Sequence, residues 1–228
     1  MQILALETTT DLGSCALWQD GRVLSATCPP GRPHSETLIP LVQGLLAEAG
    51  SSFATLDAIA FGMGPGAFTG LRVACGIAQG MAVALDRPVL PVGSLETMAW
   101  EAGAEWVVTL LDARMGEVYA GTFRRTGATL EPLGKLVLAA PGMLPLPAAE
   151  GEWVAVGNAL AAYPDLRARC AAWECRPGIL PHARSVAHLA AAAMARGDGL
   201  DPALAAPRYI RDKVARTVAE RLAEGGRS

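Results

Sequence analysis

The segment from residue 58 to residue 85 constrains this chain most, because it predicts a strand, a glycine-rich loop and a long helix in direct succession. Residues 58–61 are a short apolar run typical of a buried strand. Gly62, Gly64, Pro65 and Gly66 then require a backbone turn that a Cβ would obstruct. Thr69 is the predicted N-cap of the helix. One face of that helix is apolar, with Leu71, Ala74, Ile77, Ala78, Met81 and Leu85 at helical spacing.

This segment can serve two purposes. Free N–H groups at the helix N-terminus can hold a phosphate, or the glycines can let the helix pack very closely on a neighbour. The spacing Gly62-x-Gly64-x-x-Ala67 satisfies the dinucleotide fingerprint formally, but that fingerprint belongs at the first strand–helix turn and needs an acidic residue ending the next strand. Asp86 precedes the next strand instead, and no Gly-Lys-Ser/Thr follows for a P-loop. We therefore favour close packing over a phosphate site and disfavour an NAD-dependent oxidoreductase.

Composition limits the classes of protein that this sequence can represent. Of the 228 residues, 51% are hydrophobic and 18% are charged, which predicts a folded chain with a sizeable core. The net charge of −3 gives no general attraction to nucleic acid or to an anionic membrane. No basic region precedes Glu7 and no apolar stretch is long enough to span a bilayer, so we expect a cytoplasmic protein. Five scattered cysteines without a C-x-x-C pair predict buried, reduced thiols.

The first half of the chain predicts a mixed sheet with helices packed on it. An apolar run at residues 2–6 ends on Glu7, and residues 13–18 and 22–27 follow as strands across short turns. A helix that begins at His34 carries a stripe of apolar residues, and residues 89–92 form the last strand. The predicted order is β-β-β-α-β-α-β. The stripe consists of Leu38, Leu41, Val42, Leu45 and Leu46.

The second half repeats the opening pattern weakly, since the strand that starts at Trp106 also ends on a carboxylate, Asp112, before a turn and a return strand. We expect two lobes: residues 1–100, with the glycine loop and the dimerisation helices, and residues 101–228, with a terminal segment that packs back on the first lobe. The further expectations are a short helix at 94–103, irregular structure at 126–151, a strand at 153–156, a helical turn at 158–163 and a helix at 185–195.

Few residues have the pattern of a chemical site. Glu7 and Asp112 each end a strand in corresponding places of the two halves, so both can bind a metal or a phosphate across a cleft, or each can simply cap its turn. The histidines His34, His182 and His188 are badly spaced for metal ligation, and no nucleophile–histidine grouping stands out. We predict no metal site and no catalytic residue. The basic tail at 208–213 is interpreted as a solvated face anchored by Tyr209 and Ile210.

Five segments resemble the TsaB (YeaZ) family, in the family's order and over nearly the whole chain. They are L-A-L-E-T-T-T, H-S-E-T-L-I-P, G-M-G-P-G-A-F-T-G-L-R, L-L-D-A-R-M-G-E-V-Y and P-R-Y-I-R-D-K-V-A. The resemblance implies a two-lobed α/β fold of the actin/sugar-kinase/Hsp70-like (ribonuclease H-like) type, with mixed sheets flanked by helices. It also implies a part in forming N6-threonylcarbamoyladenosine (t6A) in tRNA. In that pathway a TsaB-like protein pairs with its catalytic paralogue, TsaD, and with the ATPase TsaE, and it meets tRNA only through the complex.

One departure from the TsaD pattern implies that this chain is a non-catalytic scaffold subunit. TsaD-type proteins carry a metal-binding His-x-x-x-His on their first long helix, whereas this chain has His34 and then Leu38. We expect the helices at 34–49 and 69–85 to pair with a TsaD-like paralogue, or with a second copy when the chain is alone. The expected interface residues are His34, Leu38, Leu41, Leu71, Ala74, Ile77, Ala78 and Met81.

A nucleotide-dependent enzyme of the same fold, acting alone, is the alternative function. ATP or ADP would then bind between the lobes or in the complex. The residues available for its phosphates are Glu7, Thr8, Thr9, Gly64 and Gly66. The family often carries a peptidase-like label, but the sequence supports neither a protease nucleophile nor a metal-activated water.

Overall fold

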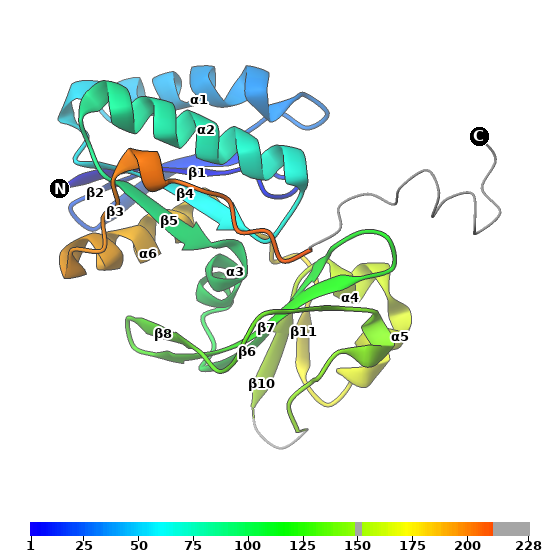
Figure 1. Ribbon diagram of the computed structural model, residues 1–228. Helices are drawn as coiled ribbons and strands as arrows, with labels where there is room; N and C mark the ends of the chain where they lie inside the picture. Colours follow the sequence, from blue (N-terminus) through cyan, green and yellow to red (C-terminus); the bar gives the residue numbers. More distant parts are fainter. Residues whose placement is uncertain (149–151, 212–228) are drawn as a thin grey trace, which may run out of the picture.

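The computed structural model describes residues 1–148 and 152–211 and divides them into two lobes, each built on its own β-sheet (Figure 1). Both sheets are mixed and have helices packed on them, which confirms the predicted fold class. Helix α3 (Ser94–Ala102) follows the last strand of the first sheet and also packs against the second sheet. The lobe boundary expected at residue 100 therefore falls inside this helix.

The sheet of the first lobe has the predicted sequence of elements. Its strands are β1 (Gln2–Glu7), β2 (Ser14–Gln19), β3 (Arg22–Thr27), β4 (Ala58–Gly64) and β5 (Val89–Gly93), in the spatial order β3-β2-β1-β4-β5. The first three strands pair antiparallel, whereas β4 lies parallel to both β1 and β5. Helix α1 (His34–Glu48) and the 3-10 turn η1 (Phe53–Thr55) precede β4, and helix α2 (Phe68–Leu85) is the crossover from β4 to β5.

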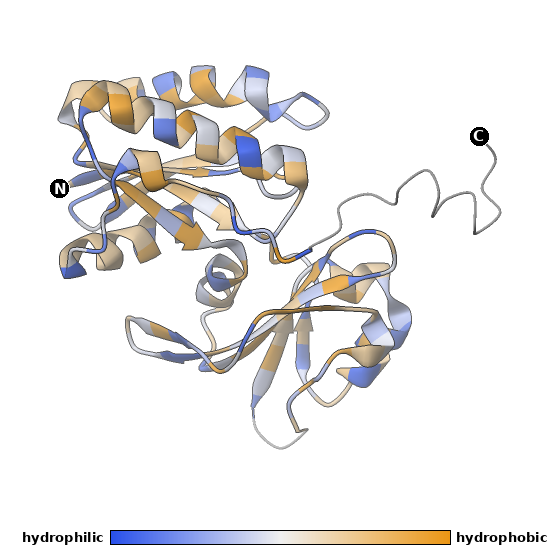
Figure 2. Cartoon of the chain, viewed as in Figure 1, coloured by the Kyte–Doolittle hydropathy of each residue, from blue (hydrophilic) through white to orange (hydrophobic). Residues whose placement is uncertain are grey.

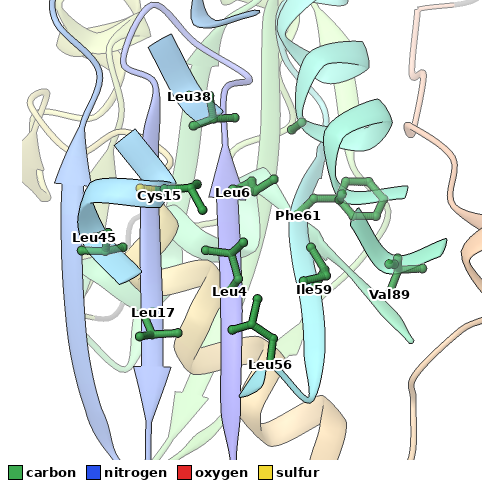
Figure 3. Packing of buried hydrophobic residues seen from close by; sticks show 14 of the residues in the cluster. Leu4, Leu6, Cys15, Leu17, Leu38, Leu45, Leu56, Ile59, Phe61 and Val89 are labelled. Atoms are coloured by element: carbon green, nitrogen blue, oxygen red, sulfur yellow. The ribbon is translucent and has the colours of Figure 1, made fainter. Parts of the chain in front are cut away.

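Because side chains alternate along each strand, the two faces of the first sheet pack into two separate hydrophobic cores. Leu4 and Leu6 of β1 face α1 and α2 (Figure 3), while Ile3 and Ala5 face helix α6 (Ala183–Arg196) on the opposite side of the sheet (Figure 1). This is the two-residue period of a strand buried on both faces. Because α6 comes from the far end of the chain, the expected second lobe at 101–228 includes a helix that covers the first sheet.

The second lobe contains the predicted strand pair around Asp112. Strands β6 (Trp106–Asp112) and β7 (Val118–Thr126) are antiparallel, and the spatial order of the sheet is β11-β10-β6-β7-β8. The remaining elements are β8 (Thr129–Pro132), β9 (Val137–Ala139), η2 (Pro141–Met143), β10 (Trp153–Val156), α4 (Ala159–Ala162), α5 (Pro164–Arg169), β11 (Glu174–Arg176) and η3 (Pro202–Leu204).

Part of the second lobe was predicted wrongly. The stretch expected to be irregular contains β8 and β9, which both pair with β7, and β8 forms a hairpin through Gly127 at φ +61°. Neither α5 nor β11 was predicted, because six and three residues are too few for a hydrophobic period to be recognisable. These short elements depend on tertiary packing: Leu166 of α5, for example, is fully buried in the second-lobe core.

Helix α2 begins two residues earlier than the predicted N-cap, Thr69, allows. Its N-cap is Ala67, and Thr69 lies inside the first turn with an exposed side chain. By length and hydropathy (18 residues, mean 1.4), α2 is the one described helix that could cross a membrane. In this fold its inner face, which includes Ala74, Ala78 and Ala82, packs on the first sheet, so these apolar residues are accounted for by the core.

Two glycines let the first turn of α2 approach the β1–β2 turn closely. A Cβ added to Gly70 would lie less than 3.0 Å from the carbonyl oxygen of Thr8, and one added to Gly66 would lie less than 3.0 Å from that of Thr9. Real Cβ atoms essentially never come so near to other atoms. Gly76, farther along the same helix, is exposed, and its added Cβ would have no neighbour within 4 Å. Glycine is therefore required at 66 and 70 by packing, and not at 76.

This difference predicts opposite effects of alanine within one helix. Gly70→Ala should lower the free energy of unfolding by roughly 1–3 kcal/mol, since the backbone atoms of Thr8 must move. Gly76→Ala should raise it by about 0.5–1 kcal/mol, because alanine costs less backbone entropy in a helix. Urea denaturation followed by circular dichroism measures both changes. Equal effects of the two variants would contradict the packing role of Gly70.

Candidate functional site

The structure places two of the predicted phosphate-binding residues inside the protein. Glu7 is fully buried; its Oε1 accepts a hydrogen bond from the backbone N–H of Thr9 (2.7 Å), and Ser94 Oγ donates to its Oε2 (3.3 Å). The hydroxyl of Thr8, also fully buried, donates to the carbonyl of Gly70 (2.7 Å). The prediction that Glu7 and Thr8 contact a phosphate is wrong, because both side chains satisfy groups of the chain itself.

The loop before α2 is tied to the β1–β2 turn. The backbone N–H of Ala67, the N-cap residue, donates to the carbonyl oxygen of Thr9 (2.7 Å). An added Cβ on Gly64 would collide with Leu71 and touch the carbonyl of Arg208, so Gly64 faces the chain's own atoms as well. The glycine loop therefore packs closely on the β1–β2 turn and on Leu71.

The remaining two predicted phosphate-binding residues line a small cleft between the lobes. Thr9 and Gly66 line it from the first lobe, opposite Asp112, Arg114 and Asn158 of the second. Its volume is about 100 Å³, whereas sites for drug-sized ligands usually exceed ~300 Å³. At the cleft, Asp11 of the first lobe forms an exposed ion pair with Arg114 (3.0 Å). A second pocket beside it, about 260 Å³ in volume, is lined by Gly66, Phe68 and Tyr119, so the space between the lobes is not limited to this cleft.

Asp112 belongs to a local hydrogen-bond network that the sequence analysis missed in part. Its Oδ1 accepts from the hydroxyl of Tyr163 and from the backbone N–H of Arg114 (both 2.9 Å), and its own N–H donates to Asn158 Oδ1 (2.9 Å). The Asp112 carboxylate thus holds the β6–β7 turn against Tyr163, the residue after α4, and the Asp112 N–H holds Asn158, the residue before that helix. Glu7 does not line the cleft that Asp112 lines, so the two carboxylates do not form one site. No short spacing in the sequence signals the partnership with Tyr163.

Burial is the largest cause of the shifted pKa of Glu7, Cys15 and Cys170. It raises the pKa of the Glu7 carboxyl above its ordinary value of 4.5, although hydrogen bonds from Thr9 and Ser94 oppose the shift. It raises the pKa of the Cys15 thiol to about 12 and that of Cys170 to about 11, which keeps both protonated and non-nucleophilic near neutral pH.

The three histidines are far from forming a site together. His34 Nε2 lies 3.0 Å from the carbonyl of Thr10, His182 Nδ1 accepts from the N–H of Arg184 at the start of α6, and His188 stacks on Trp100. Burial lowers the pKa of His182 and of His188. Within residues 1–148 and 152–211, no three His, Cys, Asp or Glu side chains gather in a way that could hold a metal ion.

The predicted docking helices lie on the surface, but half of the predicted interface residues do not. Leu38, Leu71, Ala74 and Ala78 are 0–2% exposed, because they form the core between the helices and the sheet. They cannot contact a partner directly, which corrects that part of the expectation. The other four, His34, Leu41, Ile77 and Met81, are half-buried.

The residues on the outward face of these helices were not among the predicted interface residues. Figure 2 shows that apolar residues continue along α1 and α2 on the outside of the first lobe. Helix α2 carries one stripe of larger apolar residues and another of small residues. Their spacing in the sequence does not show which of the two stripes faces the core. We define the outer helix face by seven of the exposed residues of α1 and α2, namely Ile39, Gly44, Phe68, Arg72, Gly76, Gly80 and Val83.

The basic tail is anchored by Tyr209 and Ile210 as predicted, and Arg208 is exposed, but Arg211 is not. The side chain of Arg211 is only 16% exposed; it donates to the carbonyl of Ala113 (3.1 Å) and pairs with Glu117 (2.5 Å). Tyr209 stacks on Phe68 with ring centroids 5.6 Å apart. The tail thus contacts both lobes, and only the expectation that Arg211 is solvated is wrong. Residues 212 and 213 of the motif lie outside the described residues.

Comparison with known proteins places these features in one family. The sequence profile described as "TsaD: tRNA N6-adenosine threonylcarbamoyltransferase" matches residues 30–218. The chain is 38% identical to the tRNA threonylcarbamoyladenosine biosynthesis protein TsaB of Escherichia coli (strain K12), over 94% of this chain and 96% of the relative. It is also 35% identical to the tRNA N6-adenosine threonylcarbamoyltransferase of Neisseria meningitidis serogroup A, over 42% of this chain and 32% of the relative.

A solved structure agrees with the sequence relatives. YeaZ from Pseudomonas aeruginosa superposes on this chain with a TM-score of 0.83 at 38% identity, and the match covers 92% of this chain and 99% of the other. The two-lobed fold that the resemblance implies is therefore confirmed.

The burial of Glu7 predicts how stability depends on pH. Since its folded-state pKa is raised, the folded protein binds more protons than the unfolded chain above pH 4.5, and stability falls as the pH rises from there towards the folded-state pKa. Glu7→Gln keeps the shape and the acceptor for Thr9 but carries no charge. Its free energy of unfolding should fall less over that window and should equal or exceed that of the wild type at pH 7.

Urea denaturation at a series of pH values from 4 upward measures this effect. Glu48→Gln, at the exposed end of α1, is the matched control and should follow the wild-type curve. A Glu7→Gln curve parallel to that of the wild type would show that burial of Glu7 does not set the dependence.

Proposed function

We propose that this chain, which belongs to the TsaB family of tRNA threonylcarbamoyladenosine biosynthesis proteins, acts as a non-catalytic scaffold subunit in the formation of t6A in tRNA. The family membership rests on the full-length match to the Escherichia coli protein and on the match to the TsaD profile. A role in t6A formation follows from the function that these relatives are named for. The scaffold role and the choice of partners are our inference from this chain's own geometry.

The observation that carries the scaffold role is the filled glycine loop. In this chain the carbonyl of Thr9 takes the N–H of Ala67, and Glu7 is sealed beneath the loop. Where a TsaD-type protein carries its second metal-ligating histidine, Leu38 is fully buried among apolar side chains. These features support a chain that contributes a surface rather than a reaction.

The surface that best suits this role is the outer helix face on α1 and α2. Gly76 and Gly80 leave a strip of exposed backbone along α2 where added Cβ atoms would meet nothing, so a partner helix could approach closely there. Phe68, Arg72 and Val83 flank the strip and supply larger contacts of the kind that dominate interface energies. We infer that a TsaD-like paralogue binds this face, with a TsaE-like ATPase joining the complex, and that a second copy binds it when the chain is alone.

The proposed function predicts the outcome of a reconstitution. A mixture of tRNA, threonine, bicarbonate and ATP with the enzyme that makes threonylcarbamoyl-adenylate, a TsaD-like protein and a TsaE-like ATPase should form t6A only when this chain is added. Digestion of the tRNA and mass spectrometry of the nucleosides measure the product. Formation of t6A without the TsaD-like protein would assign catalysis to this chain and overturn the scaffold role; formation without this chain would overturn its part in the reaction.

Because the outer helix face lies outside the core, substitutions on it should disrupt assembly without unfolding the chain. The double variant Gly80→Glu/Val83→Arg should abolish both the homodimer and binding of the TsaD-like partner, because two charged side chains would stand on the close-approach strip. Its melting temperature should stay near that of the wild type, since neither side chain points into the core. Ala78→Arg would not be informative, because Ala78 is fully buried.

Light scattering measures the mass of the chain alone, and size-exclusion chromatography with the TsaD-like protein measures pairing. Met143→Arg, at an exposed position (77%) on the second lobe, is the control and should leave both unchanged. Normal assembly of the double variant would remove this face from the proposal.

A further inference from the structure

The segment that follows α6 crosses from one lobe to the other. In Figure 1 it is the orange stretch that runs past β5 and along α2 towards the junction of the lobes. It begins on the first lobe, where Leu200 exchanges two backbone hydrogen bonds with Val89 of β5 (both 2.9 Å) and the carbonyl of Pro202 accepts from Gln79 of α2 (2.8 Å). Its last described residue, Arg211, contacts the second lobe.

The central part of this segment is fixed to the start of α2. The N–H of Arg208 donates to the carbonyl of Met63 (2.7 Å), and the ring of Tyr209 packs on Phe68 while its hydroxyl accepts from Arg72 Nε (3.2 Å). The guanidinium of Arg72 in turn lies 3.7 Å from the centroid of the Phe68 ring. Backbone, aromatic and cation–π contacts therefore hold the segment at one position on the first lobe.

The end of the segment is fixed to the β6–β7 turn of the second lobe. The guanidinium of Arg211 donates to the carbonyls of Ala113 (3.1 Å) and Arg114 (3.4 Å) and pairs with Glu117 (2.5 Å). Just before it, Ile210 packs against the core of the second lobe. A single nitrogen of the guanidinium, Nη2, makes all three of these contacts and so links both ends of the turn, Ala113 and Glu117.

The turn that Arg211 contacts has an uncommon backbone. Arg114, Met115 and Gly116 follow one another with φ of +61°, +56° and +75°, and non-glycine residues seldom take such values. The same turn carries the Asp11–Arg114 ion pair across the cleft, but both of those side chains are highly exposed (93% and 73%), so that contact is weak. The better-buried Arg211 makes the stronger connection.

We propose that residues 205–211 form a clasp that sets the opening of the cleft between the lobes, with Tyr209 anchored on α2 and Arg211 holding the β6–β7 turn. Release of the clasp would free that turn from the first lobe and widen the cleft lined by Thr9 and Asp112. This goes beyond the scaffold role, because it assigns to the chain a device that controls the relative position of its lobes. It depends on contacts within the chain and on no partner.

Amide hydrogen exchange of the purified full chain, read by mass spectrometry, tests the clasp. In Arg211→Ala, the peptides that cover the β6–β7 turn and the β1–β2 turn should exchange on the order of tenfold faster than in the wild type, since a charge-assisted contact between the lobes is lost. Arg196→Ala is the matched control, because Arg196 is exposed and pairs with Asp198 inside one lobe (2.8 Å). It should leave both turns unchanged.

The outcome that would overturn the clasp is faster exchange confined to residues 205–211, with both turns as slow as in the wild type. If Arg211→Ala does not fold, as judged by circular dichroism, Arg211→Lys decides the question. Lysine keeps the charge, but its Nζ ends one bond short of the position of Nη2 and cannot reach all three oxygens. The β6–β7 turn should therefore exchange faster than in the wild type and slower than in an unfolded chain. A wild-type rate in that variant would likewise overturn the proposal.

Discussion

The structure depends on how closely the β1–β2 turn approaches the first turn of α2. Two carbonyl oxygens, those of Thr8 and Thr9, lie where side chains at Gly70 and Gly66 would have to be. The approach lets the N–H of Ala67 cap Thr9 and the hydroxyl of Thr8 cap Gly70, so that polar groups at a helix start and at a tight turn satisfy each other. Glu7 is buried as a consequence, since the turn that follows it is covered by the loop.

The same approach decides what kind of protein this fold produces. A strand, a glycine loop and a helix N-terminus make an anion site only while the backbone N–H groups at the helix start point at open space. In this chain a carbonyl of the neighbouring hairpin accepts the N–H of Ala67 just before that helix, and the cleft lined by Thr9 and Asp112 holds about 100 Å³. A strand, a glycine loop and a helix can thus serve close packing in one protein and ligand binding in another.

Much of the first lobe could be predicted from its sequence, because period-two and period-3.6 patterns specify strands and helices directly. The start of α1 at His34 and the bounds of β3 agree with the prediction. The site could not be predicted in the same way. That Thr9 would cap Ala67, or that Tyr163 would bind Asp112, depends on residues 58 and 51 positions apart whose proximity only the folded sheet order creates. The inward face of α2 was ambiguous for a different reason: small residues line both sides of it, so hydrophobic spacing does not separate core from surface.

The exposed glycines of α2 are the feature that the fold itself does not explain. Gly66 and Gly70 are required by internal contacts, whereas added Cβ atoms at Gly76 and Gly80 would touch nothing. In the middle of a helix each such glycine costs about 0.5–1 kcal/mol relative to alanine, so the pair lowers stability by roughly 1–2 kcal/mol, a substantial part of the margin of a typical domain. No contact within the described chain offsets that cost. A helix that packs across this strip would offset it, since the missing side chains allow the two backbones to approach more closely than alanine would permit. The energetics therefore favour a surface shaped for a partner over one shaped for the isolated chain.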